Sequence, residues 1–164
     1  RMMGEFAAQH PERALALMDT SPGPAARTLP EYYHSRGVLL ESARRWADAE
    51  LNYRSALALF PSQPETTINL ALVLGELGRR RDGIQLLTDL IEKYPLAEGA
   101  YRNRALLRFN SDIAGFEADL KKACELLPNG PSARALAQLA AKRGDQKSSE
   151  YWKAEAKSAE PHVK

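Results

Sequence analysis

Side chains able to carry out acid–base chemistry are few and stand apart in this sequence. His34 lies near Glu31 and Glu41 in one helix-favouring segment, and a carboxylate beside a histidine can orient the ring as a general base. His10 and His162 lie far away, so the three histidines lack the spacing of metal ligands. An isolated histidine of this kind is more often solvated or faces a groove, and we predict that role for His34.

The candidate nucleophiles lack the neighbours that would activate them. Cys124 has apolar neighbours at helical spacing and no histidine close in sequence, which is typical of a packed structural cysteine. Gly75 and Gly78 lack the lysine and the preceding strand of a phosphate-binding loop, and no serine lies in a nucleophile motif. We therefore predict that the chain is not an enzyme and needs no cofactor and no metal.

Composition narrows the classes of function further. The 164 residues suffice for one domain, and 23 basic against 21 acidic side chains give a net charge of +2, too small to favour nucleic-acid binding. No stretch approaches ~18 consecutive apolar residues, so we predict no membrane span. The single cysteine excludes an internal disulfide framework; it slightly favours the cytoplasm and is compatible with the periplasm. Because the sequence begins with Arg1, we expect a processed form or a piece of a longer chain.

Regularly spaced prolines indicate an internal repeat. Each follows a helix-favouring run and marks a helix end, since proline cannot continue a helix. Intervals of 34, 33 and 33 residues separate Pro61, Pro95, Pro128 and Pro161. Apolar residues recur with helical spacing over 64–77 and 81–93, and Gly78 is placed to end the first of these helices. The repeating unit is therefore predicted to be a pair of antiparallel helices of about 13 residues each.

Large and small side chains recur at fixed positions of this unit. Counting from Pro30, positions 4, 8, 11, 20, 24, 27 and 32 carry Tyr33, Gly37, Leu40, Ala49, Tyr53, Ala56 and Pro61. Counting from Pro64, positions 7, 8, 11, 15, 20, 24 and 32 carry Leu70, Ala71, Leu74, Gly78, Gly83, Leu87 and Pro95. This pattern resembles the tetratricopeptide repeat (TPR) family over about residues 30–161. Small residues at positions 8 and 20 would let paired helices approach closely, Gly37 against Ala49 and Ala71 against Gly83.

The resemblance implies an all-α fold, a right-handed superhelical solenoid of antiparallel helix hairpins. We predict a degenerate N-terminal hairpin and loop over 1–29, TPR-like repeats over 30–63, 64–97 and 98–129, and a polar C-terminal capping repeat over 130–164. Pro11 is expected in the first turn of a short helix, followed by a loop over 20–29. The third repeat is expected to be one residue short, with a tightened turn near 111–112. In that repeat Arg108 replaces an apolar residue at position 11.

By the same resemblance, the first helices of the repeats line a concave groove that binds partners. The candidate partner-binding residues at groove-facing positions are His34, Val38, Ile68, Asn69, Leu72, Arg102, Asn103, Leu106, Phe109 and Arg134. The apolar members would supply desolvation, and the two asparagines would hydrogen-bond a peptide backbone. Arg102 and Arg134 would pair with acidic groups of a ligand. We expect both asparagines to face solvent when no partner is bound.

An alternative to a binding groove is that the apolar residues at these positions complete the packing between neighbouring first helices. The basic run 79–81 is interpreted as a solvated turn that complements the preceding helix end. Some TPR proteins clamp the free carboxylate of chaperone tails with lysine, asparagine and arginine at five groove positions. The residues at those positions are His34, Val38, Asn69, Gly99 and Asn103, of which only Asn69 agrees, so we predict no such clamp.

The function predicted from these observations is a protein–protein interaction scaffold. Its ligand would be a peptide or partner protein with an acidic or an apolar segment, held in the groove. Two other functions stay open at this point. One is a docking or regulatory module of a larger enzyme or of a secretion or assembly complex, and the other is a self-associating assembly subunit.

Overall fold

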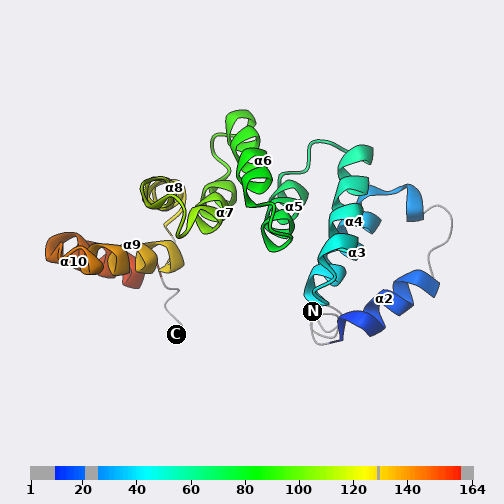
Figure 1. Cartoon of the computed structure of the whole chain (residues 1–164), viewed down its shortest axis with the longest axis horizontal. Helices are drawn as coiled ribbons and strands as arrows, with labels where there is room; N and C mark the ends of the chain where they lie inside the picture. The colour runs from blue at the N-terminus through cyan, green and yellow to red at the C-terminus, as the bar shows by residue number, and fades with distance from the viewer. Residues whose placement is uncertain (1–9, 21–25, 129, 160–164) are drawn as a thin grey trace. The chain divides into compact units, whose positions relative to one another are not determined.

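A computed structural model describes residues 10–20, 26–128 and 130–159, and every regular element in these ranges is helical (Figure 1). The α-helices are α2 (Pro11–Thr20), α3 (Pro30–Ser42), α4 (Trp46–Leu59), α5 (Pro64–Glu76), α6 (Arg80–Lys93), α7 (Glu98–Arg108), α8 (Ile113–Leu126), α9 (Gly130–Lys142) and α10 (Gln146–Ser158), with a 3-10 turn, η1, over Ala26–Thr28. Consecutive helices pack as hairpins, so the predicted all-α fold is confirmed. None of these helices combines the length and the apolar character that a membrane crossing requires.

The helix ends follow the local sequence signals. Pro30 and Pro64 lie in the first turns of α3 and α5, where a missing N–H costs no helical hydrogen bond. Pro11 begins α2 as expected, whereas part of the predicted 20–29 loop forms η1. The predicted helix before Pro11, residues 21–25 of the loop and the helix stop at Pro161 lie outside the described residues.

One residue in each hairpin turn adopts the left-handed conformation. These residues are Arg44 (φ 57°), Gly78 (φ 78°), Asn110 (φ 67°) and Gly144 (φ 74°), spaced by 34, 32 and 34 residues. Gly78 therefore ends α5 as predicted, since glycine takes positive φ without strain. Arg44 lacks that freedom, and its conformation costs on the order of 1 kcal/mol.

The third repeat is shortened in its first helix and not in its turn. Helix α7 has 11 residues whereas α3 and α5 have 13 each. Four residues, 109–112, separate α7 from α8, one more than the three residues 43–45 between α3 and α4. The predicted tightened turn is therefore wrong. Asn110 ends the helix early, and the extra residue places the Asp112 carboxylate to cap α8 by accepting the Gly115 N–H at 2.9 Å.

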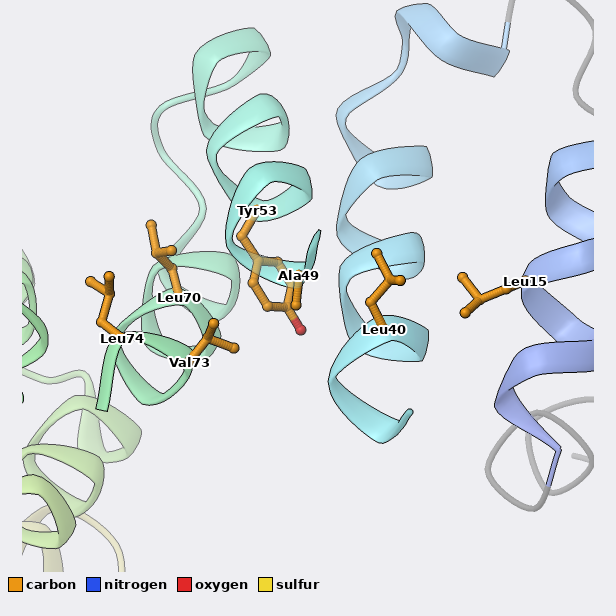
Figure 2. Packing of buried hydrophobic residues seen from close by; sticks show 7 residues of the cluster. All are labelled: Leu15, Leu40, Ala49, Tyr53, Leu70, Val73 and Leu74. Carbon is orange, nitrogen blue, oxygen red and sulfur yellow. The ribbon is translucent and has the colours of Figure 1, made fainter. Parts of the chain in front are cut away.

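The chain forms two compact units, unit 1 over residues 1–86 and unit 2 over residues 87–164, with their boundary inside α6. In unit 1, α4 packs against both α3 and α5, and α3 also contacts α5. The core joins side chains of four helices (Figure 2): Leu15, Leu40, Ala49, Tyr53, Leu70, Val73 and Leu74. Leu86 of α6 packs against the same cluster, so the second hairpin shares the core of the first.

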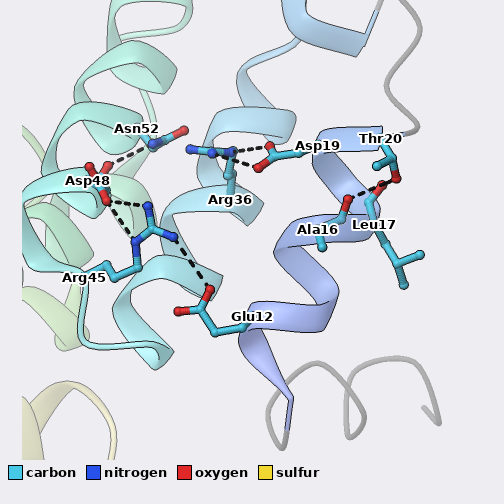
Figure 3. Close-up of polar contacts among 9 residues, drawn as sticks. All are labelled: Glu12, Ala16, Leu17, Asp19, Thr20, Arg36, Arg45, Asp48 and Asn52. Atoms are coloured by element: carbon cyan, nitrogen blue, oxygen red, sulfur yellow. Dashed lines mark hydrogen bonds and ion pairs between the residues drawn. The ribbon is translucent and has the colours of Figure 1, made fainter.

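Helix α2 covers the outer side of α3. Leu15 is almost fully buried in the core of unit 1 (Figure 2). Two ion pairs also join α2 to α3 and to the α3–α4 turn (Figure 3). Arg36 binds both carboxylate oxygens of Asp19 at 3.1 and 3.2 Å, and Arg45 lies 3.6 Å from Glu12. These pairs are largely exposed and are worth little individually, so burial of Leu15 supplies most of the attachment.

Within the α3–α4 hairpin, Gly37 lies directly against the ring of Tyr53. A Cβ atom at Gly37 would lie 2.6 Å from Tyr53 Cε1 and 2.7 Å from Cδ1. Tyr53 is fully buried, and its hydroxyl donates to Glu41 Oε2 at 2.7 Å, which fixes the ring from its far end. The small residue at position 8 is therefore needed, as predicted, and the atoms nearest to it belong to Tyr53.

Unit 2 has a smaller apolar cluster. Its buried members come from α7, α8 and α9: Ala105, Phe116, Leu120 and Leu136. Cys124 and Trp152 pack against this cluster as partly buried residues, which fits the predicted structural cysteine. In the α9–α10 hairpin, Ala137 and Ser149 hold positions 8 and 20 counted from Gly130, and both are buried. The Asp145 carboxylate caps α10 by accepting the Ser148 N–H.

An ion pair joins successive hairpins within each unit. Glu50 of α4 binds Arg79 in the α5–α6 turn at 2.8 Å, and Glu117 of α8 binds Arg143 in the α9–α10 turn. Each glutamate lies four residues after the first residue of its helix. The run 79–81 is exposed, as expected for a solvated turn, and Arg79 in addition links two hairpins.

Replacing Gly37 by alanine tests the close approach. The added methyl group must displace a buried ring, and we expect unfolding in urea to show a net loss of about 1–3 kcal/mol despite the better helix propensity of alanine. Ser35→Ala, at an exposed position of the same helix, is the control and should leave stability within about 0.5 kcal/mol. A Gly37→Ala chain as stable as the parent would contradict the packing described here.

The environment of Tyr53 predicts a loss of stability at alkaline pH. Burial, followed by the neighbouring Glu41 carboxylate, raises the pKa of Tyr53 far above its usual value. The folded chain thus holds this proton more tightly than the unfolded chain does. The raised pKa of Tyr53 therefore contributes its full stabilisation below about pH 10. Above about pH 10 this contribution to the free energy of unfolding falls by about 1.4 kcal/mol per pH unit.

Urea unfolding of the parent and of Tyr53→Phe at several pH values measures this effect. The variant keeps the ring and lacks the titrating hydroxyl, so its stability should fall less steeply above about pH 10. All other ionisable groups are the same in the two proteins, so the comparison isolates the Tyr53 hydroxyl. Equal slopes for the two proteins would show that the Tyr53 hydroxyl is not held as the structure has it.

Candidate protein-binding surface

His34 connects the first helices of two successive hairpins. Its Nδ1 lies 2.7 Å from Thr66 Oγ1, and the Thr66 hydroxyl donates to Gln63 Oε1 at 2.6 Å. Because the hydroxyl has one hydrogen, Nδ1 of the neutral ring must carry the proton and donate it, which leaves Nε2 as an acceptor. Glu41, a candidate from the sequence for orienting this ring, instead accepts the hydrogen bond of Tyr53.

Unit 1 brings four other sequence-predicted site residues onto α3 and α5. Val38 follows His34 by one helical turn and is 38% exposed, and Ile68 and Leu72 are partly buried one turn apart on α5. Asn69 is also partly buried, so its side chain is less exposed than expected, and it lies close enough to the Tyr53 hydroxyl to influence the pKa of Tyr53.

A surface pocket of about 350 Å³ lies where α3 and α5 begin, next to the loop that precedes α5. Its lining consists of Glu31, His34, Phe60, Ser62, Gln63, Pro64, Glu65 and Thr66. We call it the α3–α5 pocket. Of these residues, the sequence predicted a partner-binding role only for His34. Glu31 and Glu65 both hold position 2 of their repeats, on the first helices, whereas Phe60 follows a second helix and directly precedes the repeating proline.

In unit 2 the predicted residues lie on α7, in the turn after it and on α9. Leu106 is 60% exposed, and Phe109 is 47% exposed with its ring 5.5 Å from that of Phe116. Arg102 pairs with Glu98 one turn before it at 3.2 Å, and Asn103 donates to the Gly99 carbonyl at 2.7 Å. These polar groups are thus partly satisfied within their own helix, and Asn103 is only partly exposed.

Arg134 lies on the exposed side of α9, and its guanidinium folds back over Gly130 at the start of that helix. The two units thus present separate sets of candidate residues, one on α3 and α5 and one on α7, with Arg134 on α9.

A buried charged cluster positions α7 against α8. Arg104 binds both oxygens of Asp119, at 3.0 and 2.7 Å, and also Thr88 Oγ1 at 3.0 Å. Arg108 adds a third hydrogen bond to the same carboxylate at 2.8 Å. Asp119 is 3% exposed, so its charge depends on these partners. The arginine that replaces an apolar residue at position 11 therefore has a structural role, which local sequence rules could not show.

The chain was compared with protein-family models, with curated proteins and with solved structures. No family model matches the sequence, and no curated protein matches it. Solved structures do match: MamA (residues 41 to the end) from Desulfovibrio magneticus RS-1 has a TM-score of 0.72 at 17% identity, covering 97% of this chain and 92% of that one. TTC0263, a thermophilic TPR protein of Thermus thermophilus, has a TM-score of 0.73 at 19% identity, covering 98% and 89%. YrrB, a TPR protein with an unusual peptide-binding site, has 0.64 at 15%, covering 96% and 81%.

The chain has the TPR fold. At these identities the likeness concerns the fold alone, and the TPR fold accounts for the hairpin order, the proline positions and the small residues at position 8. Within the ranges that the structure describes, no group of three or more histidine, cysteine, aspartate or glutamate side chains could hold a metal ion.

Asp119→Asn tests the cluster that positions α7. The substitution preserves shape but removes the charge between two arginines, and we expect a loss of about 3 kcal/mol or more in the free energy of unfolding. Asp112→Asn, which keeps a capping side chain at an exposed site, should cost less than about 0.5 kcal/mol. Equal effects of the two substitutions in urea unfolding would contradict the assigned role of Asp119.

Proposed function

We propose that this chain is a protein-interaction scaffold that binds a peptide or a partner protein along the first helices of its hairpins. Helical-repeat proteins commonly use the surface formed by stacked hairpins for this purpose. The observation that carries the proposal is the exposure of apolar side chains on these helices and at their ends, namely Val38, Leu106 and Phe109. Single exposed apolar residues are ordinary, but these recur at the groove-facing positions of the repeat.

The polar neighbours of these residues support a peptide ligand. Asn103 lies one helical turn before Leu106 and next to Arg102, so an amide and a guanidinium border the exposed leucine. The amide oxygen of Asn103 remains an acceptor, since the bond to Gly99 uses only its N–H. Burial of the apolar side chains would supply about 25 cal/mol per Å² of affinity, and the polar groups would fix the register. YrrB, which shares the fold, is described as having an unusual peptide-binding site.

The test compares charged substitutions on first and second helices. Val38→Asp with Leu106→Asp places carboxylates on α3 and α7, whereas Leu51→Asp with Ile113→Asp places them on α4 and α8. The first pair is 38% and 60% exposed and the second 65% and 39%, so the two double variants are matched in exposure. Both should keep the melting temperature of the parent within a few degrees.

Each chain is immobilised, and the proteins retained from a native extract are identified and quantified. We expect the first double variant to lose the parent's specific partner by about tenfold or more, since a carboxylate buried against an apolar ligand is not paired. The second double variant should retain that partner. Retention by the first variant together with loss by the second would overturn the assignment to the first helices.

A further inference from the structure

We propose that the α3–α5 pocket binds a lysine or arginine side chain of the partner. This inference rests on the proposed scaffold function and specifies the chemistry that one part of the surface recognises. It differs from the acidic ligand that the sequence favoured, because the pocket was not visible in the sequence.

The charged groups that line the pocket are carboxylates, which accept hydrogen bonds. Glu31 and Glu65 are exposed, and neither pairs with a lysine or an arginine in the part of the chain that the structure describes. When the His34 ring is neutral and Nδ1 donates to Thr66, its Nε2 atom is a further acceptor. No lysine or arginine lines the pocket, so two carboxylates give it a net charge of −2.

Helix N-termini attract anions, and α3 and α5 both begin at this pocket. Here the first turns already carry Glu31 and Glu65, whose charges complement the two helix dipoles. A further anion would therefore meet two carboxylates at close range, whereas a cation would meet them as partners. The charge of the pocket thus selects a basic ligand.

An aromatic ring adds a second attraction for a cation. Phe60 lines the pocket and is 51% exposed, so one face of its ring is open to a ligand. A lysine ammonium or an arginine guanidinium binds favourably over such a face, at about 0.5–1 kcal/mol for an exposed site. The volume of about 350 Å³ lies at the lower end of the range for ligand pockets, about 300–1,000 Å³, and suits one long side chain.

The surroundings of the pocket suggest which residue of the partner lies beside the basic one. Val38 follows His34 by four residues on α3, a rise of about 6 Å along the helix. An extended peptide covers that distance in about two residues. A partner segment with a basic residue and an apolar residue two positions apart would therefore contact both the pocket and Val38.

The pocket is tested with small probes in NMR titrations of the full chain in about 150 mM salt. The cationic probes are Nα-acetyl-lysine methylamide and Nα-acetyl-arginine methylamide. The neutral and anionic probes are the Nε-acetylated lysine derivative and Nα-acetyl-glutamate methylamide. We expect saturable shifts of the His34, Phe60 and Thr66 signals with the cationic probes only. Equal shifts with the neutral or anionic probe would overturn the proposal.

Matched variants separate the pocket from the overall charge. Glu31→Gln with Glu65→Gln should weaken binding of the cationic probes by about threefold to tenfold, and Phe60→Leu by about twofold to fivefold. Glu76→Gln with Glu92→Gln removes the same charge from two exposed glutamates outside the pocket and should leave affinity unchanged. An equal loss in this control would show that binding follows net charge, which overturns the proposal.

The capture experiment distinguishes a failure of this inference from a failure of the scaffold function. If the pocket variants bind the cationic probes like the parent while Val38→Asp with Leu106→Asp still loses the partner, the pocket inference is wrong and the scaffold function stands. Because Phe60 is exposed, Phe60→Leu provides a folded variant even if the double glutamine variant does not fold.

Discussion

The contact between the Tyr53 ring and the backbone at Gly37 is the constraint on which unit 1 depends. Tyr53 projects from α4, its ring lies against α3 at Gly37, and its hydroxyl reaches Glu41. Tyr53 also shares a core cluster with Leu70, Val73 and Leu74 of α5, so one side chain contributes to the packing of three helices. The His34 ring lies 5.9 Å from the Tyr53 ring, which places the candidate surface directly over this contact.

Unit 2 keeps the hairpin plan but uses other interactions. Phe116, a large residue, is buried against Ala105 and Leu120, and charged side chains occupy positions that are apolar in unit 1. Asp119 balances Arg104 and Arg108, and the shorter α7 ends where Asn110 turns the chain. A cluster of this kind gives little net stability, but it fixes one arrangement because any shift leaves a buried charge without its partner. The same helical hairpin is therefore stabilised by a buried tyrosine against a glycine in unit 1 and by a buried charged cluster in unit 2.

Periodicity predicted the helices, their hairpin order and the glycine turn at Gly78, because each of these depends on residues close in sequence. The same rules could not show that Arg108 pairs with Asp119 or that Arg79 pairs with Glu50, since those partners lie 11 and 29 residues away. The pocket escaped prediction for a related reason: Phe60 reaches it from a loop. For the candidate site, the sequence predicted which residues of the first helices would line a groove. It did not predict the hydrogen bonds of their polar groups, which depend on residues distant in sequence.

The central claim is that a partner contacts the first helices of the hairpins while the second helices support them. Side-chain methyl NMR spectra of the chain, recorded with and without the captured partner, test it most directly. The account predicts that the methyl signals of Val38, Ile68 and Leu72 shift on binding, while that of the exposed Leu51 on α4 does not. A shift of Leu51 with unchanged signals of Val38, Ile68 and Leu72 would contradict it.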